Sequence, residues 1–238
     1  MSLYFPDDPG FAEALSARRG EQELDPSLRL FADRFTQTFG VAPLTVTMDS
    51  IPQPGSRRLI PQLDILLERS LDLRQFRTSP SGNFDSAKQS LTATLFAASM
   101  SHRQLPKRFG LPRWQGRTDW ARDVFVYFSE FERTAKSAAH EAVSGKELDG
   151  FVAALGLGDS FWCTQRLSKE PTVFVNTDAQ ASQLRNPDIQ RRWGDLYYPL
   201  VKRHDEFGYL ERAEIFVPVD SRETFDRDFS SNWYYYFK

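Results

Sequence analysis

The chain is poor in the residues and segments that mark several classes of protein. It has a single cysteine, Cys163, which excludes an internal disulfide and a metal site built from paired thiolates. No apolar run approaches the roughly 20 residues that span a bilayer, and the start, MSLYFPDDPG, lacks the basic and apolar regions of a signal peptide. We therefore expect a cytoplasmic protein without a membrane partner.

The chain also lacks a strong net charge. Thirty basic side chains oppose 32 acidic ones, and the formal net charge of −2 gives no global attraction to nucleic acid or anionic lipid. A content of 40% hydrophobic and 14% aromatic residues is typical of a globular protein rather than a disordered one. With 238 residues, the chain is long enough for one large domain or two small ones.

Recognisable catalytic and cofactor motifs are missing as well. The three histidines, His102, His140 and His204, do not stand at metal-ligand spacing from one another or from the cysteine. The glycines of ALGLGDS (154–160) lack the Gly-Lys-Ser/Thr ending of a phosphate loop and follow a helical pattern rather than a strand. We expect no metal and no cofactor, and no enzyme class follows from the sequence.

The hydrophobic patterns predict an α+β fold with mixed or mostly antiparallel sheets and flanking helices. Two helices are well marked, one over 27–39 between Asp25-Pro26 and Gly40, and one that begins at Asn186-Pro187 and runs towards Gly208. Further helices are predicted over 70–76, 130–143, 146–155 and 221–229. Strands are predicted over 42–49, 63–69, 90–98, 123–131, 160–167, 170–178, 213–220 and 232–238, with 160–167 and 170–178 forming a hairpin.

The order of these elements suggests an internal repeat. The segments 27–39, 42–49, 63–69, 70–76 and 90–98 resemble 146–155, 170–178, 213–220, 221–229 and 232–238 in that order. Chance similarity between two β-rich stretches is the alternative, because the second copy needs an inserted helix and an inserted strand. We expect an N-terminal α+β half over 1–100, a basic aromatic loop over 101–122 and a C-terminal α+β half over 123–238, which together form either separate halves or one continuous domain.

The segment 101–122 is the main candidate for a functional surface. It carries six basic side chains and one acid, a net charge of +5, with aromatic residues interleaved. The predicted partner-binding residues are Arg103, Lys107, Arg108, Arg113, Trp114, Arg117 and Trp120. Arginine and tryptophan suit protein–protein hot spots, and also phosphate clamping and base stacking. In a third interpretation the tryptophans cover a sheet edge while the arginines stay solvated.

These observations support the hypothesis of a non-catalytic protein that binds another macromolecule, of the regulatory or immunity type, with a protein as the main partner. The aromatic C-terminus, 233–237, is expected to be tied to the fold, with its exposed part as a second contact region. The alternative is a nucleic-acid or phosphate binder, or an enzyme acting on phosphodiesters or nucleotides, with His102 as general acid or base beside Arg103, Arg108 and Arg113. Cys163 is expected to be a small buried hydrophobic residue, because no base for a thiolate nucleophile is evident.

Overall fold

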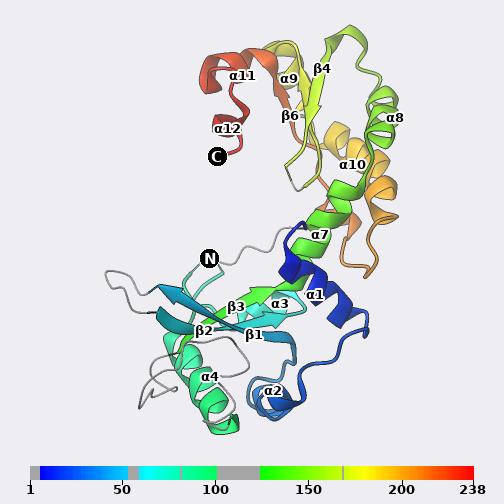
Figure 1. Ribbon diagram of the computed structural model, residues 1–238. Coiled ribbons are helices and arrows are strands. Elements are labelled where there is room, and N and C mark those ends of the chain that lie inside the picture. The colour runs from blue at the N-terminus through cyan, green and yellow to red at the C-terminus, as the bar shows by residue number, and fades with distance from the viewer. Residues whose placement is uncertain (1–5, 53–58, 81, 101–123, 168) are drawn as a thin grey trace. The chain divides into compact units, whose positions relative to one another are not determined.

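The computed structural model describes residues 6–52, 59–80, 82–100, 124–167 and 169–238. The chain divides into two compact units, which we call unit 1 (Met1–Thr134) and unit 2 (Ala135–Lys238). Each unit contains one three-stranded sheet flanked by helices (Figure 1). The α+β class predicted from the sequence is confirmed, and both sheets are mixed, with one antiparallel and one parallel pair of strands.

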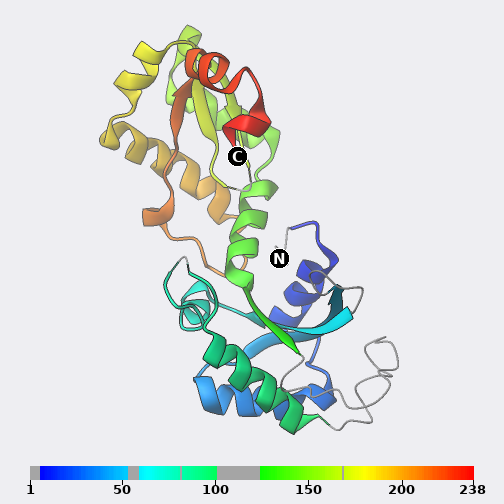
Figure 2. The same ribbon diagram turned by 90° about the vertical axis from the view of Figure 1, so that its left-hand side faces the viewer.

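Unit 1 is built around the sheet β1-β2-β3, which we call sheet 1. Its elements in chain order are α1 (Pro9–Arg18), α2 (Pro26–Phe39), β1 (Pro43–Pro52), β2 (Leu59–Leu67), α3 (Ser70–Arg74), α4 (Ser86–Ser99), β3 (Phe125–Glu130) and the start of α7 (Phe131–Ala142). Strand β1 is antiparallel to β2, and β3 is parallel to it. Helices α2 and α4 lie on one side of the sheet, and α1 lies on the other (Figures 1 and 2).

The core of unit 1 lies between sheet 1 and the helices α2 and α4. Alternate residues of the central strand, Leu63, Ile65 and Leu67, are fully buried there against Phe31 and Phe96. The opposite face of the sheet is mixed: Leu66 is buried there, and the hydroxyl of Ser129 donates a hydrogen bond of 2.8 Å to the buried carboxylate of Asp64. The alternation follows from the two-residue period of a strand, and β2 contains most of the strand predicted over 63–69.

The prediction of a strand over 90–98 is wrong, because this segment lies inside helix α4. The carboxylate of Asp85 accepts hydrogen bonds from the amides of Ala87 and Lys88 and so begins the helix. The threonines suggested a strand, yet the hydroxyls of Thr92 and Thr94 donate to carbonyls four residues earlier in the helix. Helix α4 also reaches the outer strand, since Gln89 Nε2 donates a hydrogen bond of 2.7 Å to the carbonyl oxygen of Val126 in β3.

Unit 2 is built around the sheet β4-β5-β6, which we call sheet 2. It contains the rest of α7, then α8 (Gly145–Leu155), a 3-10 turn (Gly158–Ser160), β4 (Phe161–Gln165), β5 (Thr172–Val175), α9 (Asp178–Leu184), α10 (Pro187–Lys202), a second 3-10 turn (Arg212–Glu214), β6 (Val219–Ser221), α11 (Arg222–Phe229) and α12 (Trp233–Tyr236). The hairpin predicted over 160–178 is confirmed as the antiparallel pair β4-β5. Helices α8 and α10 lie on one side of sheet 2, with α11 and α12 on the other (Figure 1).

Two strands predicted in unit 2 need correction. Of the segment 213–220 only Val219 and Asp220 belong to a strand, because Arg212–Glu214 forms a 3-10 turn. The segment 232–238 is not a strand but contains helix α12, which begins where the side chain of Asn232 accepts from the amide of Tyr234. Helix α10 begins at the predicted cap Asn186 and ends at Lys202, before the expected stop at Gly208.

Among the described residues, no helix is both long enough and apolar enough to cross a lipid bilayer.

Candidate interaction surface

The basic segment singled out from the sequence lies outside the described residues. This applies to the predicted contact residues Arg103, Lys107, Arg108, Arg113, Trp114, Arg117 and Trp120, and to His102 of the alternative enzyme hypothesis. The prediction that this segment contacts a partner therefore stays a prediction. The second predicted contact region, the aromatic C-terminus, is described in full.

The C-terminal segment packs onto sheet 2 through a cluster of aromatic rings. Phe225 of α11 stacks on Trp233 of α12 with 3.9 Å between ring centroids, and Trp233 also stacks on Trp162 of β4 at 5.8 Å. Phe174 of the central strand makes a T-shaped contact with Trp233, with 5.1 Å between ring centroids. The guanidinium of Arg222 lies over the Trp162 ring at 5.3 Å. Contacts of these kinds add about 0.5–1.5 kcal/mol each beyond area burial, so the end of the chain is held firmly, as expected.

Helix α12 is fixed by polar contacts at both of its ends. The side chain of Asn232 caps its start, and the hydroxyl of Tyr236 donates a hydrogen bond of 2.9 Å to Asp220 Oδ2 in β6. The other oxygen of Asp220 accepts from Arg185 Nη2 at 2.7 Å. Burial, together with the Asp220 carboxylate, raises the pKa of the Tyr236 phenol, so the phenol stays a hydrogen-bond donor.

The same helix presents two tyrosines to solvent. Tyr234 is 67% exposed and Tyr235 is 56% exposed, with 5.6 Å between their ring centroids. The Lys238 ammonium lies 5.6 Å from the Tyr234 ring centroid. The flanking residues Trp233 and Tyr236 are the ones that turn inward to the aromatic cluster. Two amphipathic rings are thus displayed from an anchored helix, which reduces the side-chain and backbone freedom lost on binding a partner.

The turn before α12 uses an unusual backbone. Ser230 and Ser231 have φ angles of 52° and 53°, in the left-handed region that residues other than glycine seldom adopt. The hydroxyl of Ser231 donates a hydrogen bond of 2.6 Å to Asp226 Oδ1. This turn reverses the chain between α11 and α12 and so brings Trp233 onto Phe225.

The two histidines that the structure describes, His140 and His204, contact other residues of the fold. His140 is 4% exposed, and burial, with Arg166 and Lys169 nearby, lowers its pKa to about 4. Its Nδ1 atom lies 3.1 Å from the hydroxyl of Tyr197, whose pKa burial raises to about 12. His204 lies near the end of α10, with Nε2 3.7 Å from Glu147 Oε2. His140 is therefore a neutral core group at pH 7, closed off from a substrate.

Cys163 is half-buried in β4 rather than fully buried. Burial raises the pKa of its thiol to about 11. At pH 7 the thiol is thus overwhelmingly protonated, which makes it a poor nucleophile and a poor metal ligand. Among the described residues, no group of three or more histidines, cysteines and acids is arranged to hold a metal ion.

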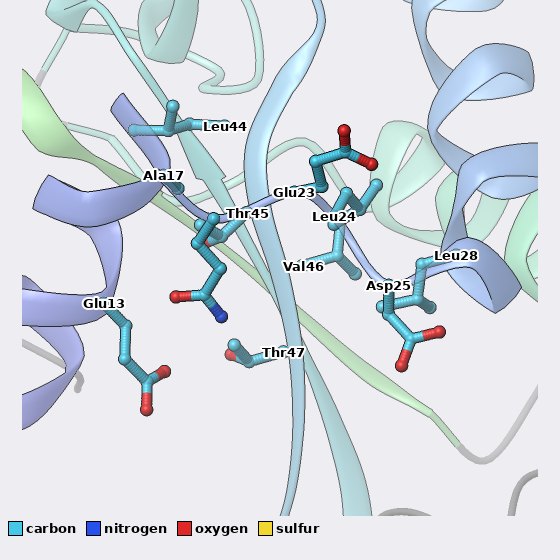
Figure 3. A pocket seen from close by; sticks show the side chains of 11 residues that line it. Glu13, Ala17, Glu23, Leu24, Asp25, Leu28, Leu44, Thr45, Val46 and Thr47 are labelled. Atoms are coloured by element: carbon cyan, nitrogen blue, oxygen red, sulfur yellow. The ribbon is translucent and has the colours of Figure 1, made fainter. Parts of the chain in front are cut away.

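A small cavity of about 120 Å³ lies beside β1 in unit 1 (Figure 3). Its wall includes the carboxylates of Glu13, Glu23 and Asp25, together with Leu28 and Thr47. Two of the acids already have partners, because Asp25 accepts from the amide of Ser27 at 2.8 Å and Glu23 is ion-paired with Arg29. The cavity is smaller than the roughly 300 Å³ that small-molecule sites usually need.

Comparison with protein-family models, with curated proteins and with solved structures gave no significant match for this chain. A role for the candidate interaction surface is therefore inferred from the chemistry of its own residues alone.

Proposed function

We propose that the protein is a non-catalytic binding protein that works in the cytoplasm and recognises another protein. The observation that supports this most directly is the pair Tyr234 and Tyr235, exposed on a helix whose other aromatic residues are packed onto sheet 2. Tyrosine is enriched at the energetic centres of protein interfaces because it offers a large rigid ring and a hydroxyl at little cost in conformational entropy.

The basic segment 101–122 is retained as a second contact region of the proposal. Its charge of +5 stands in a chain whose remaining residues carry an excess of acids. A basic region of this kind favours partners with an acidic surface, because charge complementarity speeds encounter and suppresses wrong partners.

The test begins with the full-length protein, tagged and used to capture partners from a lysate of its host. Captured proteins are identified by mass spectrometry, and the affinity of each is then measured with purified components. We expect the double variant Tyr234→Ser/Tyr235→Ser to bind its partner at least about tenfold more weakly, since an interface hot spot contributes about 2 kcal/mol or more. The matched control is Leu71→Ser, which changes an equally exposed apolar residue (70%) in unit 1.

A second variant, Arg108→Glu/Arg113→Glu, examines the basic segment separately. Loss of binding, with an unchanged melting temperature, is the expected result, because the proposal assigns these two charges to partner contact and not to the core. If both double variants bind every captured protein as tightly as the wild type does, the proposal is wrong.

A further inference from the structure

The two sheets share their strand order and their strand orientations. In each sheet the middle strand pairs with an antiparallel strand that precedes it in the chain and with a parallel strand that follows it. Among the described residues, α3 and α4 lie between β2 and β3, and α9 and α10 lie between β5 and β6. The helix before each first strand ends at a glycine in the left-handed region, Gly40 with φ of 73° and Gly156 with φ of 69°. A topology this simple can arise twice by chance. The pairing register of the strands is therefore a stronger sign of an internal repeat than the strand order is.

The antiparallel ladder of sheet 1 contains an irregularity at its end. Pro43 pairs with Leu67 and Thr45 pairs with Leu66, so Leu44 is the extra residue of a bulge in β1. The bulge lies opposite the last two residues of the middle strand.

Sheet 2 has its irregularity at the same place. Phe161 pairs with Val175 and Cys163 pairs with Phe174, which leaves Trp162 as the extra residue of β4. Here too the bulge lies opposite the last two residues of the middle strand, Phe174 and Val175, and it has the same length.

A glutamate joins the starts of two helices in each unit. In unit 1 the amide of Ser70, the first residue of α3, donates a hydrogen bond of 3.0 Å to Glu132 Oε2, in the second residue of α7. In unit 2 the amide of Asp178, the first residue of α9, donates one of 2.7 Å to Glu223 Oε2, in the second residue of α11. We call each of these contacts a glutamate clasp.

The unit 1 clasp has a defined position relative to the parallel ladder. Leu67 and Glu130 are register partners at the end of β2 and β3. The donor, Ser70, follows Leu67 by three positions, and the acceptor, Glu132, follows Glu130 by two.

The unit 2 clasp has the same position. Val175 and Ser221 are register partners at the end of β5 and β6. The donor, Asp178, follows Val175 by three positions, and the acceptor, Glu223, follows Ser221 by two. Both clasps therefore occupy one site, defined by the ends of the two parallel strands.

The clasp performs a definite physical task. The first amides of a helix have no carbonyl partner within the helix, and a carboxylate near this positive end is favourable. Helix α3 has no side-chain cap from Arg69, so Glu132 supplies an acceptor that the local sequence does not. Each clasp also ties the helix after the middle strand to the helix after the third strand.

We infer that the chain consists of two copies of one building unit, aligned by the bulge and the clasp. In this alignment β1 corresponds to β4, β2 to β5, α3 to α9, α4 to α10, β3 to β6 and the start of α7 to α11. Of the five correspondences suggested by the sequence, this alignment keeps only the first, that of 27–39 with 146–155, which pairs α2 with α8. The other four are replaced. Helix α12, with Tyr234 and Tyr235, has no counterpart in unit 1, where α7 leads directly to α8.

The inference is tested by hydrogen exchange at single amides of the full-length protein, followed by NMR. In the wild type we expect the amides of Ser70 and Asp178 to be protected although neither has an intrahelical acceptor. The variant Glu132→Ala should lower protection at Ser70 at least about tenfold and leave Asp178 unchanged, because a hydrogen bond to a charged group is lost in unit 1 alone. The variant Glu223→Ala should do the reverse, so each variant serves as the control for the other.

Glutamine variants at the same positions keep an acceptor oxygen and should give intermediate protection, which covers the case in which an alanine variant unfolds. Exchange of either wild-type amide at the rate of an unstructured peptide overturns the inference. The same holds if the two alanine variants do not change protection in this reciprocal way while far-UV circular dichroism stays native.

Discussion

The Nδ1 atom of His140 lies 3.1 Å from the hydroxyl oxygen of Tyr197, and the two rings stack at 5.7 Å between centroids. This pair joins α7 to α10 inside unit 2. Arg166 of the hairpin donates a hydrogen bond of 3.0 Å to the carbonyl of Val143, at the end of α7, and its positive charge opposes protonation of the imidazole. A neutral histidine in this place makes the stability of unit 2 depend on pH.

We predict that unit 2 loses stability as the pH falls from 6.5 towards 4. The folded-state pKa of His140, about 4, lies below the ordinary value of 6.5, so the unfolded chain takes up the proton first. The free energy of unfolding should drop by up to about 3 kcal/mol across this window. Denaturant unfolding at several pH values measures the change. His140→Gln should remove this part of the pH dependence, whereas His204→Gln, at a partly exposed histidine, should leave it in place.

Removal of the partner hydroxyl tests the same contact at constant pH. Tyr197→Phe keeps the ring packed against Phe151 but leaves His140 Nδ1 without its hydrogen bond. We expect a loss of about 1–2 kcal/mol in the free energy of unfolding at pH 7, since a buried polar atom becomes unsatisfied. Tyr198→Phe is the neighbouring control, because Tyr198 is only half-buried and its hydroxyl makes a long hydrogen bond of 3.4 Å to the carbonyl of Leu210 and a contact with Lys202. Equal effects of the two substitutions would contradict the proposed importance of the His140 contact.

Gly194 in α10 is predicted to tolerate no side chain. A methyl group there would lie 2.8 Å from Nη2 of Arg212 and 2.8 Å from the carbonyl oxygen of Ile215, so Arg212 would have to move. Gly194→Ala should therefore destabilise unit 2 by about 1–3 kcal/mol, despite the higher helix propensity of alanine. Gly150→Ala, in α8, meets no atom within 4 Å and should raise stability by up to about 1 kcal/mol. Thermal unfolding of the two variants distinguishes the cases.

Trp233 and Tyr234 are adjacent in α12 but should differ in their effect on stability. Trp233→Ala removes a ring that contacts Phe225, Trp162 and Phe174, and we expect a loss of about 2 kcal/mol, given that the indole is half-buried. Tyr234→Ala, at a residue 67% exposed, should change the free energy of unfolding by no more than about 0.5 kcal/mol. Similar losses in both variants would show that Tyr234 is part of the fold and not free for a partner.

The elements that the sequence predicts well have local signals. Helix α2 has its cap at Asp25 and its left-handed stop at Gly40, and the hairpin β4-β5 joins two β-rich runs through a short turn. The sequence of helix α4 favours a strand because threonines such as Thr92 and Thr94 favour strands on average. The carbonyls four residues earlier come within reach of their hydroxyls only once the helix has formed.

The features that the sequence does not predict are those that depend on residues far apart along the chain. Strand β6 has three residues, and it is a strand because it pairs with β5, whose register partners lie 46 positions earlier. The partners of each clasp are 62 and 45 residues apart, and no spacing rule links them. The exposure of Tyr234 and Tyr235 could be anticipated only in part, since an aromatic terminus must bury some rings and the pattern does not say which.

We expect the contact between Gln89 and the backbone of β3 to limit self-association of the protein at high concentration. Open strand edges offer hydrogen-bonding groups to other chains and promote aggregation. Because the Gln89 amide occupies the Val126 carbonyl, α4 closes part of this edge with a side chain of its own unit. Leucine at position 89 would fit a helix equally well, yet it would leave that carbonyl open to an incoming strand and make the protein prone to self-association.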